Sequence, residues 1–197
     1  MARPIHIEQA DIVEAAKHTI QKRGLAATTL KNVATEAGVT QGMVYYHFKT
    51  KEELLLAVLR SFFSDFIELS VKSWTSVGDP GTKVASAFDA SRDTYGKRDD
   101  LHKLLINVAT FSLQHEEAGI EFGQLLQTAQ LAIRICCADI YESWGPSCLP
   151  APEPLSRIIF SLMIGMSIQC LFNKEIDVDE VYDTLKEMVL DLMLFYR

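Results

Sequence analysis

The sequence is poor in cysteine and proline, and this excludes several classes of protein at the outset. Six prolines beside 48% hydrophobic residues argue against a disordered chain and for one that buries a core. The four cysteines, Cys136, Cys137, Cys148 and Cys170, contain no C-x-x-C pair, so neither a disulfide framework nor a zinc site is expected. We expect reduced cysteines packed in the interior, with redox sensing by Cys148 as the alternative.

Long apolar runs and catalytic motifs are also missing. The longest run, residues 158–172, contains Ser161, Ser167 and Gln169 and is shorter than the roughly 20 residues that a membrane span needs. It therefore predicts a buried or interface helix. No apolar stretch follows a basic start, so we expect no signal peptide and a cytoplasmic protein. Because no G-x-S-x-G, H-E-x-x-H, Walker A or G-x-G-x-x-G motif occurs, we expect neither an enzyme nor a bound cofactor or metal.

The net charge is acidic, at −7, but it is unevenly distributed along the chain. Residues 1–60 contain eight Lys and Arg against six Asp and Glu, a net charge of +2. Residues 61–197 contain 11 basic and 20 acidic residues, a net charge of −9. A mildly basic head on an acidic body indicates that the N-terminal end is the one that meets phosphates.

Apolar residues recur at helical spacing along most of the chain, and no segment alternates as a strand does. Thr50 with Glu53, and Asp177 with Glu180, have the spacing of capping boxes at helix starts. The predicted helices cover residues 7–23, 30–37, 40–48, about 51–74, a fifth marked by 84–95, a sixth marked by 101–111, then 120–144, 155–172 and about 177–196. The sequence thus predicts an all-α fold of about nine helices.

Residues 28–51, TTLKNVATEAGVTQGMVYYHFKTK, predict two short helices joined by a tight turn at Gly38. On the first helix, Leu30, Val33, Ala34 and Ala37 are expected to face inward. Val39 is expected to fill the angle between the helices, and the second helix is expected to bury Val44, Tyr46 and Phe48. Such a pair is how a helix-turn-helix places its second helix in the major groove.

This segment closely resembles the helix-turn-helix of the TetR (tetracycline repressor, AcrR-like) family of transcriptional regulators. The family pattern is T-x-x-x-I-A-x-x-A-G-V-S-x-G-x-x-Y-x-H-F-x-x-K-E-x-L, from which the sequence departs by Val33 for Ile and Thr40 for Ser. The matching residues are Thr29, Val33, Ala34, Ala37, Gly38, Val39, Thr40, Gly42, Tyr45, His47, Phe48, Lys51, Glu52 and Leu54.

The resemblance implies a DNA-binding domain over residues 1–53, with its helix-turn-helix at 29–48, that binds a palindromic operator as a homodimer. The start of the second helix enters the groove, where Gln41 is expected to read adenine and Met43 a thymine methyl group. The residues predicted to contact DNA are Thr29, Thr40, Gln41, Gly42, Met43, Tyr45, His47 and Lys51.

Among these residues, Thr29, Tyr45, His47 and Lys51 are expected to contact phosphates. Thr40 has the alternative role of an N-cap, and His47 that of a packed ring between helices. The segment that contains Arg3 is either a minor-groove arm or a free terminus.

The resemblance assigns residues 54–197 to effector binding and dimerisation, with the last two helices forming a four-helix bundle with a second subunit. Ser161 and Gly165, small residues four apart, allow close helix approach, and the last helix has a broad apolar stripe. The predicted interface residues are Ser161, Gly165, Val181, Leu185, Val189 and Leu192. The alternative is that both helices are core helices of a monomer.

An unidentified small-molecule effector is expected to bind among the fourth to eighth helices. The candidate residues are Phe62, Phe66, Phe88, Tyr95, His102, Phe111, Met163 and Met166, although aromatic residues at helical spacing are commonly core residues. The separation of His102 and His115 does not support a metal site. An activator or nucleoid-type protein with the same head, and an adaptor without a ligand, are the alternative functions.

Overall fold

The structure, a computed structural model, describes residues 7–75, 78–93, 99–144 and 151–195. These residues contain nine α-helices and no strand, which confirms the predicted all-α fold. The helices are α1 (Gln9–Arg23), α2 (Leu30–Glu36), α3 (Gln41–His47), α4 (Lys51–Thr75), α5 (Pro80–Ser91), α6 (Asp99–Ser112), α7 (Glu116–Trp144), α8 (Pro152–Phe172) and α9 (Val178–Phe195).

Two helices begin earlier than the apolar pattern predicts. α7 starts at Glu116 rather than at residue 120, and acidic side chains in its first turn stabilise the positive end of the helix dipole. α8 starts at Pro152 rather than at residue 155, because proline at a first helical position sacrifices no backbone hydrogen bond. Polar or proline-rich first turns carry no apolar periodicity, which is why the pattern misses them.

At the end of α1 and the start of α4, where the predicted and observed boundaries agree, local hydrogen bonds fix the helix end. α1 ends at Gly24, whose φ of 77° is a left-handed value that favours glycine and whose N–H donates to the Ile20 carbonyl. At the start of α4, the Thr50 hydroxyl accepts the Glu53 N–H at 3.1 Å. The Glu53 carboxylate accepts the N–H of Lys49, at 2.7 Å, and not that of Thr50 as in a capping box.

The chain packs as two compact units, and each is described by itself. Unit 1 comprises Met1–Phe62 and Asp100–Phe122, and unit 2 comprises Phe63–Asp99 and Gly123–Arg197. Both α4 and α7 therefore contribute residues to each unit. A functional division between residues 53 and 54 stays a prediction.

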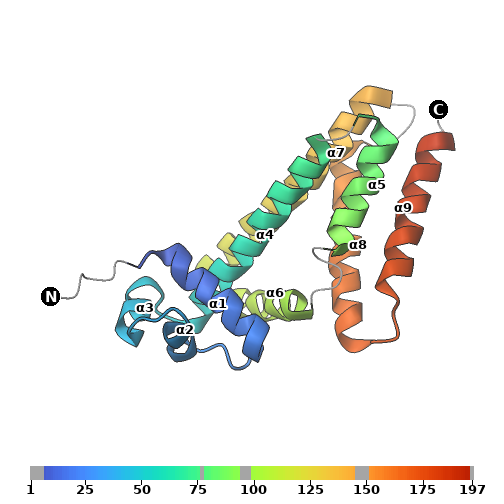
Figure 1. The fold of residues 1–197 in the computed structure, drawn as a ribbon. Coiled ribbons are helices and arrows are strands. Elements are labelled where there is room, and N and C mark those ends of the chain that lie inside the picture. The colour runs from blue at the N-terminus through green and yellow to red at the C-terminus, as the bar shows by residue number, and fades with distance from the viewer. Residues whose placement is uncertain (1–6, 76–77, 94–98, 145–150, 196–197) are drawn as a thin grey trace. The chain divides into compact units, whose positions relative to one another are not determined.

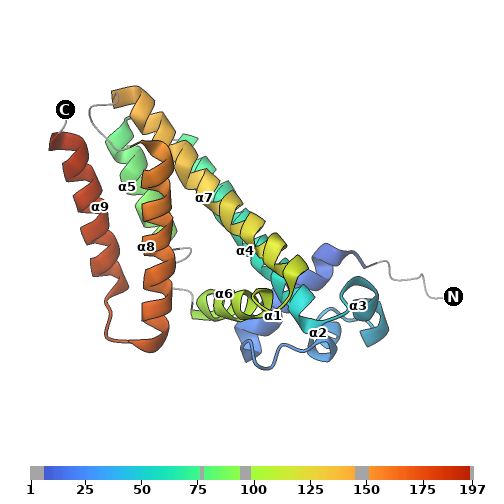
Figure 2. The same cartoon turned by 180° about the vertical axis from the view of Figure 1, so that it is seen from behind.

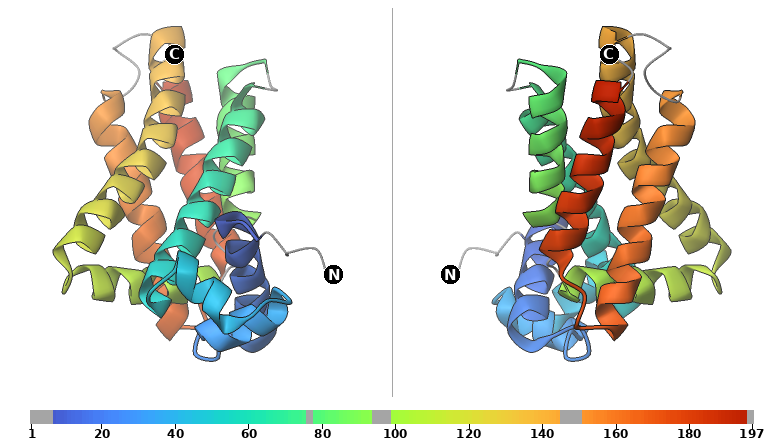
Figure 3. Two further views of the ribbon diagram at one scale, coloured as in Figure 1. Left: turned by 90° about the vertical axis from the view of Figure 1, so that its left-hand side faces the viewer. Right: turned by 90° about the vertical axis from the view of Figure 1, so that its right-hand side faces the viewer.

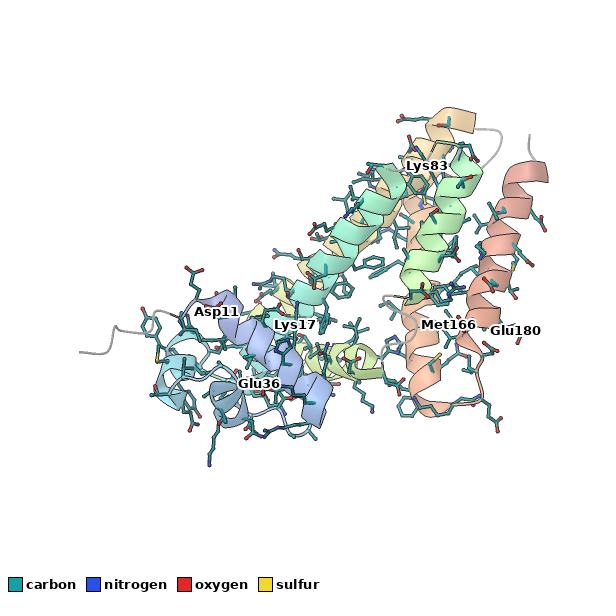
Figure 4. All side chains as sticks on the ribbon, in the orientation of Figure 1. Asp11, Lys17, Glu36, Lys83, Met166 and Glu180 are labelled. Atoms are coloured by element: carbon teal, nitrogen blue, oxygen red, sulfur yellow. The ribbon has the colours of Figure 1, made fainter. Side chains whose placement is uncertain are left out.

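Unit 1 groups α1, α2 and α3 at the start of α4, as both views in Figure 3 show. α2 packs against α1 and against α3 (Figure 1). An ion pair of 2.5 Å between Lys22 and Glu36, the latter labelled in Figure 4, also joins α1 to α2. The largest fully buried side chains among the described residues of this unit are Ile12, Thr19, Thr28, Val33, Val44, Leu54, Val58, Leu59, His102, Leu104 and Val108.

Unit 2 contains α5, α8 and α9 with parts of α4 and α7, and α8 runs beside α9 (Figure 2). Its core cluster consists of Trp74, Val84 and Ile140. α5 is tied to α9 by Arg92, which lies 3.3 Å from Asp179 and 3.4 Å from Asp183. Burial at one end of α5 and ion pairs at the other hold this helix in place.

Candidate functional site

The turn between α2 and α3 is formed by a single left-handed residue. Gly38 has a φ of 70°, a conformation that strains any other side chain, and the N–H of Val39 returns to the Ala34 carbonyl at 3.0 Å. Ala34 is buried, so the two helices meet over a small side chain. The predicted helix-turn-helix is confirmed at this turn.

Threonine side chains cap both helices of the motif. The Thr29 hydroxyl accepts the Asn32 N–H at 3.1 Å, and the Thr40 hydroxyl accepts the Met43 N–H at 3.4 Å. Each cap satisfies a backbone donor that the helix itself leaves unpaired. The N-cap role proposed for Thr40 is therefore confirmed, and a DNA contact by the same exposed residue stays a prediction.

The outer face of α3 carries an aromatic residue that the sequence placed in the core. Tyr46 is 78% exposed, so its predicted burial is wrong, whereas the predicted burial of Phe48 is confirmed. Residues of a helix are about 100° apart around the axis, so burial of Val44 turns Tyr46 roughly 200° away. Gln41 and Tyr45 are exposed as well. The exposed face of α3 is therefore both amide-bearing and aromatic.

Other predicted contact residues of α3 lie at its two ends. At the start of α3, Gly42 is exposed and Met43 is half-buried. At its end, the half-buried His47 places its ring edge-on to Tyr46, with ring centroids 5.2 Å apart. Because Tyr46 is the adjacent residue of the same helix, this contact does not show a ring packed between helices, and both roles of His47 stay predictions.

Two lysines follow the end of α3. The ammonium of Lys49 donates to the carbonyls of Tyr45 and Tyr46, at 3.1 and 3.3 Å, where the helix dipole favours a cation. The ammonium of Lys51 donates to the Leu25 carbonyl at 3.1 Å. Lys51 therefore braces the loop after α1, and a phosphate contact by its other two protons stays a prediction.

Unit 2 contains a cavity of about 80 Å³ with a mostly apolar wall. Of the effector residues predicted from the sequence, Phe66, Phe88 and Met163 line it. The described residues of the wall are Phe66, Trp74, Val84, Ala87, Phe88, Ser91, Ala132, Ile133, Cys136, Cys137, Ile140, Leu155, Ile159, Met163, Tyr182 and Val189.

The remaining predicted effector residues lie elsewhere. Phe62, His102 and Phe111 belong to unit 1: Lys17 lies over the Phe62 ring, His102 is buried, and Phe111 stacks on His115. Met166, labelled in Figure 4, lies on α8 outside the described cavity wall, and Tyr95 lies outside the described residues.

Sequence reasoning missed several wall residues because they come from distant segments. Trp74 lies in the last turn of α4, Cys136 lies on α7, and Tyr182 lies on α9 beside the apolar stripe of that helix. Burial raises the pKa of the Cys136 thiol to about 12 and that of Cys137 to about 11, so both are protonated at neutral pH. The predicted interior position holds for Cys137 and Cys170, and Cys148 lies outside the described residues.

A polar triad stands beside this wall. The Asp139 carboxylate accepts hydrogen bonds from the Lys83 ammonium, at 2.8 Å, and from the Trp74 indole N–H, at 2.9 Å. The Lys83 ammonium, labelled in Figure 4, also lies 5.5 Å from the centroid of the Trp74 ring system. The hydrogen bond from Lys83, opposed by desolvation and reinforced by Trp74, lowers the pKa of Asp139. One carboxylate thus joins α4, α5 and α7.

Asp139→Asn is expected to lower the melting temperature at neutral pH, by an amount that shrinks as the pH falls through the lowered pKa of the folded Asp139 carboxyl. An aspartate whose folded pKa is below the ordinary value of about 3.9 contributes stability above that value and loses it as the pH falls through the folded pKa. Because the side chain is 44% exposed, solvent screening keeps the effect below about 1 kcal/mol. Thermal melting of Asp139→Asn and of the control Glu142→Gln, also on α7, checks this. A deficit that stays unchanged as the pH is lowered from neutral into the acid range, down to the point where the carboxyl is protonated, contradicts it.

One face of α8 and α9 exposes large apolar side chains. On α8, Ile158, Leu162 and Ile168 are exposed, and Phe172 is 82% exposed. On α9, Val181 and Met188 are exposed. α8 is long and apolar enough to cross a bilayer by length and composition, and it is the one such helix among the described residues.

The predicted interface residues fall partly on this face. Ser161 is exposed, and a Cβ added at Gly165 meets no atom within 4 Å. Leu185 is half-buried, as is Val189, which lines the cavity. The side chain of Leu192 lies outside the described part of the structure.

Metal binding has no geometric support in the described residues, where no group of three or more His, Cys, Asp or Glu side chains is placed to hold an ion. His102 is buried in α6, whereas the exposed His115 stacks on Phe111 with ring centroids 4.0 Å apart.

Comparisons with known proteins match both the motif and the fold. The family described as "Bacterial regulatory proteins, tetR family" matches residues 12–58. The HTH-type transcriptional regulator TtgR of Pseudomonas putida is 51% identical over 53 residues, which cover 27% of this chain and 25% of that protein. The HTH-type transcriptional repressor KstR2 of Rhodococcus jostii is 35% identical over 124 residues, covering 59% and 60%.

The structural match extends over nearly the whole chain. A putative transcriptional regulator from Saccharomonospora viridis, solved in complex with choline, has a TM-score of 0.73 and 20% identity over 92% of this chain and 94% of that one. The sequence matches span less than two thirds of the relatives' lengths, whereas the similarity of fold includes the cavity-bearing unit. The motif at α2 and α3 is thus similar to the DNA-binding segment of the tetR family of bacterial regulatory proteins, and the nine helices of the described residues have the fold of solved transcriptional regulators.

Proposed function

We propose that this protein is a ligand-responsive transcriptional repressor that acts in the cytoplasm. It binds a palindromic operator as a homodimer and is released by a small-molecule effector. The main support for DNA binding is the exposed face of α3, which presents Gln41, Tyr45 and Tyr46. This helix belongs to a motif in which a threonine caps the start of each helix. The relatives that match this segment have the names of regulators and repressors, not of enzymes.

Base reading and phosphate binding fall to different residues of this motif. Gln41, exposed at the first turn of α3, suits a bidentate contact to adenine. Tyr45, His47 and Lys51 suit phosphates, and we add Tyr46, whose exposed ring extends the same surface. Phosphate contacts orient the head on the duplex, so that the Gln41 amide meets one base pair.

Dimerisation is supported by the apolar face of α8 and α9. An exposed stripe of this kind costs free energy in water unless a partner covers it, and a second copy with the same stripe does so around a two-fold axis. The dimer then places two reading heads on half-sites one helical turn, about 34–36 Å, or a multiple of it apart.

Effector release is supported by the small size of the cavity. Its volume of about 80 Å³ is roughly half that of an engineered cavity that holds benzene, so we expect an organic ligand to shift residues of its wall. α4 supplies Phe66 and Trp74 to the wall and begins at Lys51, directly after the recognition motif. A ligand that shifts α4 therefore alters the spacing of the heads, and linkage requires that DNA weaken the ligand equally.

Gln41→Ala is expected to weaken operator binding by about 1–3 kcal/mol and to leave binding to random DNA unchanged. The amide reads a base edge, whereas nonspecific affinity comes from phosphate contacts. Fluorescence anisotropy with DNA from upstream of the chain's own gene, at fixed salt, measures both affinities. Gln114→Ala, an exposed glutamine outside the motif, is the control. Equal losses on both DNAs remove Gln41 from base reading, and no salt-dependent binding at all refutes the proposed function.

A further inference from the structure

The cavity of unit 2 has almost no polar group in its wall. Among the described residues that line it, no carboxylate, ammonium or guanidinium side chain occurs. Ser91 and Tyr182 supply hydroxyl groups, and Cys136 and Cys137 supply thiols. The rest of the described wall is carbon, apart from the sulfur of Met163 and the indole N–H of Trp74, which donates to Asp139.

The charged side chains that flank the wall residues are held in ion pairs, in which the carboxylates Asp89, Asp93, Asp179 and Asp183 outnumber the cations Arg92 and Lys186. The Asp139 carboxylate accepts one hydrogen bond from the Lys83 ammonium and one from the Trp74 indole, so two of its acceptor positions are already occupied by protein donors. Farther along α5, Asp89 accepts from Lys186 at 3.0 Å, and Lys186 also pairs with Asp183. A ligand anion or cation in the cavity finds no uncommitted counter-charge in its described wall.

Four aromatic residues of the wall could instead form an aromatic cage that binds a cation. Phe66, Trp74, Phe88 and Tyr182 all line the cavity, and cations bind over aromatic faces. However, the ring that binds cations best, Trp74, already has the Lys83 ammonium 5.5 Å from its centroid. The indole face is therefore already occupied by one cation, and a second cation loses its hydration without gaining a carboxylate in the described wall.

The two thiols of the wall lie in an environment that is poorly solvated. Burial raises the pKa of Cys136 and Cys137, which means that this region disfavours a charged group of its own. The same desolvation acts on a ligand.

We infer that the effector is an uncharged, predominantly apolar molecule, held by the wall residues of α4, α5, α7, α8 and α9, an inference that rests on the proposed function. A single hydroxyl on the ligand is compatible with the wall, because Ser91 and Tyr182 reach it with polar groups. A quaternary ammonium such as choline and a carboxylate of the same size are excluded by their charge.

Three compounds of one shape and different charge test this inference. They are 3,3-dimethylbutan-1-ol, which is uncharged, its cationic counterpart choline, and 3,3-dimethylbutanoate, an anion. Each is titrated without DNA into the full chain labelled with carbon-13 at the methionine methyl groups. The Met163 methyl lies in the cavity wall, and Met43 in α3 is the internal reference. We expect the alcohol to shift the Met163 signal with a Kd at least tenfold lower than that of either ion.

Two variants of α5 locate the binding. Ala87→Leu places a larger side chain in the cavity and is expected to abolish the shift caused by the alcohol. Ala85→Leu makes the same change on α5 outside the described wall and is expected to preserve it. If Ala87→Leu does not fold, as judged by circular dichroism, the three-compound comparison on the unaltered chain still decides.

Choline or the carboxylate binding as tightly as the alcohol overturns the inference, and so does the absence of any Met163 shift with the alcohol. DNA binding is measured separately by anisotropy. A chain that binds the alcohol selectively but is not released from its operator refutes the proposed regulation while the ligand class stands.

Discussion

Gly165→Leu is expected to convert a dimeric protein into a folded monomer. In the protomer, a Cβ at this position meets nothing within 4 Å, and leucine is a better helix former than glycine, so the fold of α8 is not disturbed. In the proposed dimer, the added side chain lies where α8 crosses a helix of the partner subunit closely. Because the dimer is two-fold symmetric, each interface contains two such side chains. Overpacking of about 1–3 kcal/mol at each copy weakens dimerisation by about 2–6 kcal/mol, roughly 30-fold to 10⁴-fold in Kd.

Light scattering and sedimentation over a range of concentrations measure this dimer Kd. Gly123→Leu is the matched control, since its added Cβ on α7 also meets nothing within 4 Å and the position lies outside the proposed interface. Operator affinity is expected to fall with the dimer, because one head holds one half-site. A wild-type monomer contradicts the proposed dimer, and an undiminished Gly165→Leu dimer moves the interface away from this part of α8.

Leu59→Ala is expected to destabilise the protein by about 2–5 kcal/mol, the largest loss of folding free energy expected from any of these changes. Leu59 lies on α4 within unit 1 and is completely buried, so its truncation removes apolar burial and leaves a cavity. For a chain of this length, the corresponding fall in melting temperature is about 4–20 °C.

Leu113→Ala makes the same substitution in unit 1 at a residue that is 88% exposed, and is expected to change stability by less than about 0.5 kcal/mol. Urea unfolding at one fixed protein concentration compares the two variants, because dimerisation makes the midpoint concentration-dependent. Similar losses in both variants show that Leu59 is not a core position.

The sequence by itself determined the features that depend on neighbouring residues. Gly24 and Gly38 end their segments in left-handed conformations, and Thr29 and Thr40 cap the helices that follow them. Each of these features involves partners only a few positions apart, so residue type and spacing suffice to predict it. The same local pattern carried the resemblance to the TetR family, and hence the interpretation of the recognition helix.

Only the tertiary structure decided which apolar side chains share a surface. Tyr46 and Phe48 are both aromatic and only two positions apart, yet only Phe48 meets the core. Phe62 and Phe66 recur on one stripe of α4, and only Phe66 lines the cavity.

The triad of Asp139, Lys83 and Trp74 shows most directly why the sequence alone does not predict which side chains meet. Asp139 meets Lys83 from 56 positions away and Trp74 from 65 positions away. Helical periodicity defines a face of each helix but not the helix that will cover it. That choice is made by the packing of all the faces together, so the cavity and the ion pairs beside it became visible only in three dimensions, and the proposed ligand class is inferred from them.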